Sequence, residues 1–344
     1  MVNRDKNLDL YKGVLIILVI LGHALQFGFG PQYRFSELFY DDFMFRAIYT
    51  FHMPLFMTIS GFLFYYSNSK NYQSVILSKI KYIGIPFLSY FVIIYGLIFY
   101  FANADSFYFI DFINKMRINM WFLSSLLLNC MIVSSTVHFF KKRELVYLVF
   151  AFIFVLFHVL SDDIIPSHHK FMFFYFLVGY WCCNKFGVFF ICNKVLLVSL
   201  LSLLFIFTLF IFDKELFVYG SGLCIIKEGR LSLQQLFIDI IRYVIGIVNG
   251  LCFCSVLVLL NKYRWFSKIS DYLLHLGNNT LAIYGVQSIA FILISELLEL
   301  HEVCIPYNYV IPIAWVIIVI IISELFILVS DKSKLCRFLF LGRK

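Results

Sequence analysis

The stretch Leu8-Asp9-Leu10-Tyr11-Lys12-Gly13, continued by the apolar run Val14 to Leu21 and then Gly22-His23, decides the fold of this chain. A second apolar segment, from Met44 to Tyr66, contains Phe51-His52-Met53-Pro54-Leu55-Phe56. Each segment is long enough to cross a bilayer as a helix, and each carries one histidine within its apolar length. Burying an ionisable side chain there costs several kcal/mol unless a partner satisfies it, so intramembrane histidines are functional-site hypotheses by default. Two of them in one antiparallel hairpin predict a single site in the outer half of the membrane.

The composition of the whole chain is strongly apolar. Hydrophobic residues make up 62% of the 344 residues and charged residues 14%, with a mean hydropathy of +0.90, which excludes an ordinary soluble domain. We predict an all-α, polytopic membrane helix bundle that forms one domain over 1–344. About ten spans are expected, near 8–28, 44–66, 83–101, 121–137, 146–160, 170–190, 195–212, 236–260, 281–299 and 309–329.

The positive charges predict the orientation. With the N-terminus inside, about two thirds of the 28 Lys and Arg fall in inner segments, so both termini are expected to be cytoplasmic. The net charge of +8 is explained by this topology and does not indicate nucleic-acid binding. A cleavable signal peptide is the alternative for the first segment. Lys12 lies ahead of the apolar core and no small-x-small cleavage site follows His23, which favours a retained span.

Helical spacing places three polar residues of the first segment on one side. Lys12 and His23 are eleven residues apart, about three turns or 16 Å, and Asp9 precedes Lys12 by three residues on nearly the same stripe. Lys12 either snorkels to the inner headgroups with Asp9 as its partner or meets an anionic ligand. In the second segment, Pro54 cannot donate to the carbonyl of Thr50, which predicts a distortion of the helix beside His52.

Several motifs resemble membrane acyltransferase family 3, the O-acetyltransferases of bacterial surface polysaccharides. The family's first span carries an arginine, ten residues and a histidine, and the matching positions are Lys12 and His23, with Asp9 before them. Two departures stand out: Lys12 replaces the usual arginine, and Gln287 stands where many members carry a histidine. Further matches run through the chain in the expected order: Phe51 to Phe56, Ser60-Gly61-Phe62-Leu63, Pro86, Trp121-Phe122-Leu123, Gly179-Tyr180 and Gly277-Asn278-Asn279-Thr280-Leu281-Ala282-Ile283-Tyr284.

The resemblance implies an acetyl-CoA donor used from the cytoplasm, no metal, and location in the bacterial inner membrane. The acceptor it implies is a sugar hydroxyl of a surface glycan such as O-antigen, capsule or exopolysaccharide, or of a lipid-linked oligosaccharide. Lys12, Lys79 and Lys81 at inner ends are expected to hold the CoA phosphates. His23 is expected to take the proton of the attacking hydroxyl and His52 to orient the acyl carbonyl or His23, with Asp9 completing the site.

Two other function classes stay open, a polysaccharide polymerase or flippase and a small-solute transporter. A polymerase would carry a large outer loop with catalytic basic residues, and a transporter would carry paired broken helices in two halves. Of the remaining polar residues, His168 and His169 are expected in an outer connection, where they either touch a glycan or are solvated. Asp239, Arg242 and Glu324 lie near span ends and are expected to form pairs within the bundle.

Overall fold

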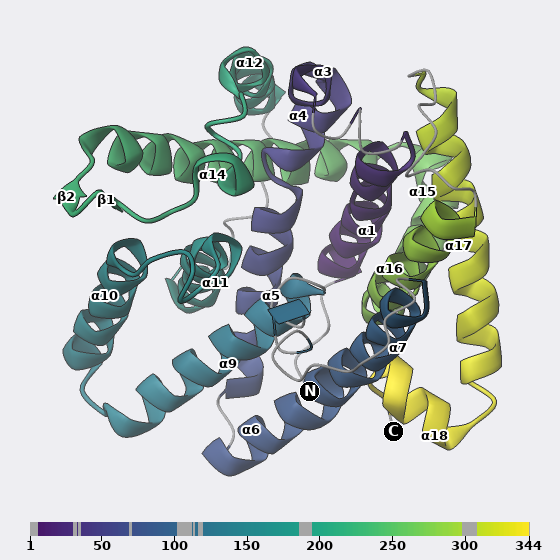
Figure 1. Ribbon diagram of the computed structural model, residues 1–344, viewed down its shortest axis with the longest axis horizontal. Coiled ribbons are helices and arrows are strands. Elements are labelled where there is room, and N and C mark those ends of the chain that lie inside the picture. The colour runs from purple at the N-terminus through teal and green to yellow at the C-terminus, as the bar shows by residue number, and fades with distance from the viewer. Residues whose placement is uncertain are drawn as a thin grey trace. The chain divides into compact units, whose positions relative to one another are not determined.

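The computed structural model describes residues 6–29, 33, 36–68, 71–101, 112, 114–115, 120–185, 195–297 and 308–343, and these residues are overwhelmingly helical (Figure 1). Each of the ten apolar segments coincides with a helix or a pair of helices: α1 (Lys6–Phe27), α4 (Phe43–Tyr49) with α5 (His52–Asn68), α7 (Ile85–Phe101), α9 (Trp121–Phe139), α10 (Arg143–Val159), α11 (Ser167–Lys185), α12 (Val195–Ile211), α14 (Leu233–Leu260), α16 (Thr280–Leu297) and α17 (Val310–Ser330).

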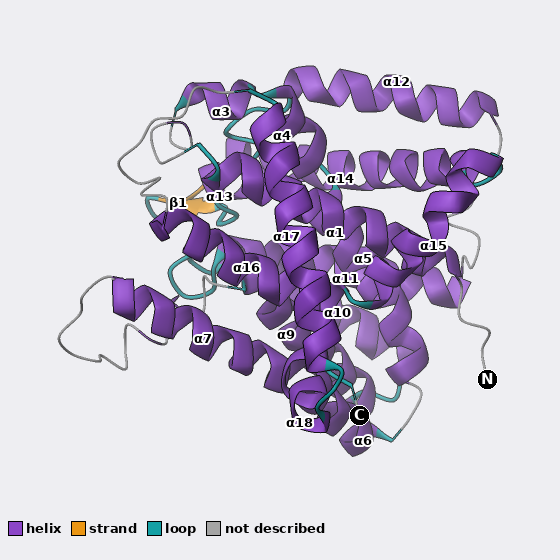
Figure 2. Ribbon diagram, turned by 90° about the vertical axis from the view of Figure 1, so that its right-hand side faces the viewer, coloured by secondary structure: helices purple, strands orange, loops and turns teal. Residues whose placement is uncertain are grey.

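Shorter elements connect these helices: α3 (Glu37–Asp41), α6 (Tyr72–Lys79), η1 (Ile80–Gly84), α13 (Val218–Ser221), α15 (Arg264–Asn278), α18 (Lys334–Cys336) and η2 (Arg337–Leu341). One two-stranded antiparallel hairpin, β1 (Ile226–Lys227) and β2 (Arg230–Leu231), is visible among the helices in Figure 2. The predicted all-α class is therefore confirmed.

Six helices of the described ranges are long and apolar enough to cross a membrane: Asn7–Phe27, Phe43–Asn68, Tyr72–Phe101, Trp121–Phe139, Leu233–Leu260 and Val310–Ser330. A seventh span results if α15 and α16, bent by 77° at their junction, count as one. The ten predicted spans exceed this number for physical reasons. The 17 residues of α10 and of α12 rise only about 26 Å, and α11 begins and ends with polar residues. The protein is nevertheless multi-pass.

The chain divides into two compact units. The first comprises Met1–Ile48, Lys81–Leu123 and Ser267–Lys344, and the second comprises Tyr49–Ile80 and Ser124–Phe266. In the first unit, α1 packs against α16 and α17, and α16 also contacts α7 (Figure 1). In the second, α5 and α11 form the most extensive helix pair of the described chain, and α12 runs along α14. The prediction of one domain over 1–344 stays a prediction.

Glycines explain how closely α5 and α11 pack. A methyl group at Gly61 would lie 2.1 Å from the carbonyl oxygen of Phe176, and one at Gly179 would lie 1.9 Å from that of Thr58. Each helix therefore presents backbone to the other, which is how small residues let membrane helices approach. Gly61 and Gly179 both belong to motifs that resemble the acyltransferase family, and close packing accounts for them.

Candidate active site

Helix α1 carries three of the predicted site residues. It is continuous from Lys6 to Phe27, so the spacing that aligns Asp9, Lys12 and His23 holds in the structure. Asp9 is buried, and its Oδ1 lies 2.8 Å from Lys12 Nζ across an i,i+3 step. The pairing of Lys12 with Asp9, which belongs to the snorkelling alternative, is thus present in the structure. It fixes the ammonium group and balances its charge at a half-buried position.

The Asp9–Lys12 pair lies where α1 crosses α15. A methyl group at Gly13 would come within 1.9 Å of the carbonyl oxygen of Leu273, and one at Gly277 within 1.8 Å of that of Asp9. Because two glycines allow the helix backbones to touch, the position of the Asp9–Lys12 pair depends on α15 as well as on α1.

The Gly277-Asn278-Asn279-Thr280 motif forms the elbow between α15 and α16. The two helices meet at an angle of 77°, and Asn279 donates from Nδ2 to the carbonyl oxygen of His275 at 3.0 Å. Arg343 binds the bend itself, since its Nη2 donates to Asn278 O at 2.9 Å and to Asn279 Oδ1 at 2.7 Å. The elbow sets the direction in which α16 leaves toward His23.

His23 meets α16 through Gln287, the residue that departs from the family pattern. The two atoms Nδ1 of His23 and Oε1 of Gln287 are 2.8 Å apart, and Gln287 is fully buried. Gln287 Nε2 donates to Ser288 Oγ at 3.4 Å, and Ser288 Oγ in turn donates to the carbonyl oxygen of Tyr284. This direction of donation makes Oε1 an acceptor, so His23 carries its proton on Nδ1. The proton-accepting nitrogen of His23 is then Nε2.

Aromatic edges complete the surroundings of His23. The rings of Phe27 and Phe291 stand nearly perpendicular to the imidazole, with centroids 5.8 and 6.2 Å away. Phe27 follows His23 by one turn of α1, and Phe291 follows Gln287 by one turn of α16. The imidazole is therefore held in one orientation by two helices.

His52 belongs to the second unit. It is the first residue of α5, is buried, and packs edge-on against Tyr49 with ring centroids 5.0 Å apart. Thr50 and Phe51 separate it from α4, so the helix is interrupted at the residue whose carbonyl Pro54 cannot engage. Pro54 itself lies in the first turn of α5, where a missing N–H costs nothing. The predicted distortion beside His52 is present.

A second group of histidines and aromatic rings lies in the same unit. His168 and His169 are not in a connection as expected. They open α11 and are buried, because the helix already begins at Ser167. His169 Nδ1 lies 2.5 Å from Ser125 Oγ, and the ring of His168 stacks on Tyr219 at 5.4 Å. Buried in this way, these histidines are packing and hydrogen-bonding residues rather than solvated ones.

The lysines predicted to bind the donor belong to different units, Lys79 to the second and Lys81 to the first. Lys79 Nζ lies 5.2 Å from the ring centroid of Phe64. Lys81 is exposed and lies over two rings, those of Tyr82 at 5.9 Å and Phe338 at 5.5 Å. Such cation–π contacts steady each ammonium group. The hydroxyl of Ser60 donates to the carbonyl oxygen of Phe56 at 2.9 Å, so its hydrogen bond lies within its own helix.

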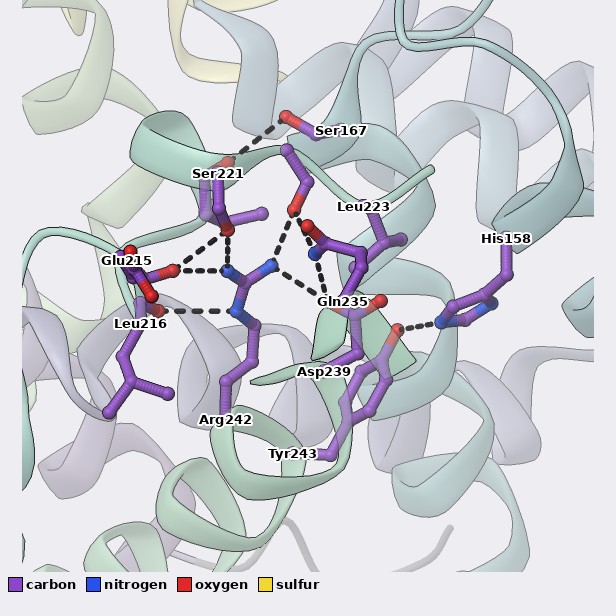
Figure 3. Close-up of polar contacts among 12 residues, drawn as sticks. His158, Ser167, Glu215, Leu216, Ser221, Leu223, Gln235, Asp239, Arg242 and Tyr243 are labelled. Atoms are coloured by element: carbon purple, nitrogen blue, oxygen red, sulfur yellow. Dashed lines mark hydrogen bonds and ion pairs between the residues drawn. The ribbon is translucent and has the colours of Figure 1, made fainter. Parts of the chain in front are cut away.

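The sequence did not predict the extent of the network around Arg242, shown in Figure 3. The expected pair with Asp239 is confirmed at 3.0 Å between Nη1 and Oδ1. The guanidinium also donates to Ser221 Oγ at 2.5 Å and to three carbonyl oxygens, those of Glu215, Leu216 and Gly222. The predicted pairing of Glu324 is likewise confirmed, with His275 at 3.0 Å. Within the described ranges, no group of three or more His, Cys, Asp or Glu could hold a metal ion.

Comparison with known proteins adds a family to this geometry. Two proteins named nodulation protein NolL, from Sinorhizobium fredii and Mesorhizobium japonicum, are 56% and 51% identical to the chain over 61 residues. That stretch is 18% of this chain and 16% of each relative, so the match spans only a small part of both. No solved structure matches the chain. A family profile described as an acyltransferase domain matches residues 5–330, and the chain therefore belongs to this family of acyltransferases.

Proposed function

We propose that the protein is a membrane O-acyltransferase that moves an acetyl group from cytoplasmic acetyl-CoA to a sugar hydroxyl of a cell-surface polysaccharide. O-antigen, capsule and exopolysaccharide are the acceptor classes, either as polymer or as lipid-linked units. Family membership over residues 5–330 and the multi-pass helical structure support the general reaction and its setting. The resemblance of the motifs supports the donor and the acceptor.

The observation that carries the proposal is the fixed imidazole of His23. With its proton on Nδ1 toward Gln287, Nε2 takes the proton of the acceptor hydroxyl. The hydroxyl oxygen attacks the thioester carbonyl, the carbon–sulfur bond breaks, and the CoA thiolate receives a proton from the imidazolium. A thioester is already activated, so this direct transfer needs no covalent intermediate on the protein.

The donor site is proposed at the inner ends of the helices. Lys12, held by Asp9, is three turns from His23, a separation that the extended CoA molecule can bridge. Lys79 and Lys81 are proposed to contact CoA phosphates as well. His52 is proposed to hold the acyl carbonyl.

Location in the inner membrane with both termini cytoplasmic completes the proposal. A reporter fused after Lys344 is expected to report from the cytoplasm, and a cysteine placed at Asp213 is expected to react with an impermeant reagent from outside. A reporter exposed outside would mean an odd number of crossings.

The elbow between α15 and α16 adds one feature that transporters also show, a discontinuous helix. The deciding test therefore follows the acyl group itself. Membrane vesicles that contain the acceptor are supplied with acetyl-CoA carrying radiolabel in the acetyl group, and the glycan fraction is assayed for label that mild alkali releases. We expect ester-linked label in vesicles with the wild-type protein and none with His23→Ala. Equal labelling in both, or no labelling in either, contradicts the proposal, and uptake of free solute without glycan labelling indicates a transporter.

A further inference from the structure

A cavity of about 440 Å³ lies beside the Arg242 network, and none of the residues assigned to acyl transfer lines it. It is lined by nine residues of the second unit: Lys214, Glu215, Gly220, Ser221, Lys227, Ser232, Gln234, Gln235 and Ile238. Small-molecule sites have volumes of about 300–1,000 Å³, so this cavity is large enough for a sugar residue with its neighbour.

The wall of the cavity is built in advance by buried and partly buried hydrogen bonds (Figure 3). Arg242 holds the backbone at Glu215 and the side chain of Ser221, both of which line the cavity. Gln235 donates from Nε2 to Asp239 Oδ1 at 2.9 Å and to the carbonyl oxygen of Gly222 at 3.2 Å. A site whose supporting groups are fixed loses little entropy when a ligand binds.

Lys227 is also fixed in place. It lies on β1, whose hairpin turns through Glu228 and Gly229, both with positive φ angles of 51° and 75°. Two positive angles are the backbone signature of a tight type I′ turn. Lys227 Nζ donates to the carbonyl oxygen of Ser221 at 3.1 Å, so the ammonium group of this exposed side chain is held at the cavity.

The chemistry of the lining is cationic and polar. The lining contains two lysines and one glutamate, and hydroxyl and amide groups occupy most other positions. Helix α14 begins here, with Ser232 as its N-cap, and its 28 residues direct the positive end of the helix dipole to the cavity. None of the nine lining residues is aromatic, so the cavity has no flat face on which an uncharged sugar ring would stack.

We propose that this cavity binds an acidic sugar residue of the acceptor glycan, with Lys214 and Lys227 on the anionic group and Glu215 on hydroxyls. The proposal rests on the proposed function in that the acceptor is a glycan. The sequence-predicted topology puts the 213–235 connection on the outer side, where a surface glycan is assembled. A carboxylate-bearing sugar and an anionic lipid headgroup share this chemistry, and the experiment separates them.

The test measures binding without acyl-CoA. The full-length protein in phosphatidylcholine nanodiscs is titrated calorimetrically with tri-galacturonate as the acidic probe and with maltotriose as the neutral one. We expect tri-galacturonate to bind at least about ten-fold more tightly than maltotriose. Lys214→Gln and Lys227→Gln should each weaken tri-galacturonate by about ten-fold. Lys262→Gln, the same change in charge just beyond the opposite end of α14, should leave binding unchanged.

Three outcomes overturn the proposal: no binding of tri-galacturonate, equal binding of maltotriose, or wild-type affinity for tri-galacturonate in both lysine variants. In a further arm, phosphatidylglycerol replaces part of the phosphatidylcholine. If this lipid competes with tri-galacturonate and the competition disappears in Lys227→Gln, the occupant is a headgroup and the assignment to a sugar is wrong. Because no acetyl-CoA is present, failure of this test is distinguishable from failure of acyl transfer in the vesicle assay.

Discussion

His23 and Arg242 are both polar side chains in apolar helices, yet their surroundings differ in kind. Arg242 is 3% exposed, and each of its five N–H groups has a fixed acceptor on Asp239, Ser221 or a backbone carbonyl. His23 is partly exposed, and its Nδ1 is bound to one amide oxygen that sets its tautomer. A guanidinium with every donor engaged holds structure together, whereas a histidine of fixed tautomer is suited to move a proton.

This comparison teaches how to judge polar residues inside a membrane protein. The general expectation that such residues are functional does not distinguish the two. The two residues are distinguished by how many of their N–H donors already form hydrogen bonds within the protein. By this criterion the Arg242 network shapes the segment 213–223, which is consistent with the proposal that the chemistry takes place at His23.

The largest expected effect is on the chemistry of the first region. His23→Ala should lower kcat/KM for acyl transfer by ~10²–10⁴-fold, as removal of a general base does, while the amount of folded protein stays near that of the wild type. The measurement is the initial rate per mole of monodisperse protein. His138→Ala, at an exposed position on α9, serves as the control and should keep its rate. A folded His23→Ala protein with normal turnover would falsify the assignment of the base.

Arg242→Met should affect stability instead. Removing the guanidinium leaves Asp239 buried without its counter-charge and removes one donor from each of four other acceptors, which costs about 3–5 kcal/mol of unfolding free energy. Thermal unfolding in detergent, with the yield of monodisperse protein, measures this loss. The double variant Asp239→Asn/Arg242→Met should be less destabilised than the single one, because no charge stays unpaired. Full stability with loss of transfer would place Arg242 in the catalytic machinery and remove the contrast with His23.

The two regions were predictable from sequence to different degrees. Asp9 and Lys12 lie on one helical stripe, so their pairing follows from spacing alone. The acceptors of Arg242 are mostly backbone carbonyls 20 to 27 residues earlier in the chain, and a backbone atom carries no residue signature. The only available signal was the polar stripe of Gln235, Asp239 and Arg242 on an apolar helix.

Contacts between distant segments escaped prediction for a similar reason. Gln287 stood out as a departure from the family pattern, but its contact with His23 joins residues 264 positions apart. Apolar length predicted where helices form because lipid burial requires intrahelical hydrogen bonds. Apolar length did not predict α15, a shorter helix that ends at the Gly277 to Thr280 elbow. The face that each helix turns toward its neighbour is decided by packing, which periodicity alone does not encode.

Gln287 sharpens the comparison within the first region. If its amide oxygen fixes the tautomer of His23, Gln287→Leu should lower kcat by ~10- to 100-fold with little change in either KM, as loss of partners that orient a functional histidine does. Gln287→His should recover most of the rate, since an imidazole can also accept from Nδ1–H. Ser288→Ala, one position along α16, should lose far less. A Gln287→Leu protein with normal kcat would show that packing by Phe27 and Phe291 is sufficient to orient His23.

The smallest expected effect concerns Lys12. Its surroundings are intermediate between those of Arg242 and His23, because it is paired with Asp9 and also half-buried toward the N-terminal end of α1. If Lys12 meets the anionic donor, Lys12→Ala should raise the KM for acetyl-CoA by roughly ten-fold, the effect of losing one charge-assisted hydrogen bond. The KM for the acceptor should change little, because Lys12 is three helical turns from His23. Lys12→Arg should retain or improve activity, since a guanidinium grips phosphate with two parallel bonds. If instead Lys12 only anchors α1 at the headgroups, Lys12→Ala should reduce the amount of inserted protein without changing either KM per folded molecule.

Asp9→Asn separates these outcomes further. It leaves the ammonium in place but removes the carboxylate that holds it, so in a donor site it weakens acetyl-CoA binding, whereas an anchoring lysine keeps its donor kinetics in Asp9→Asn.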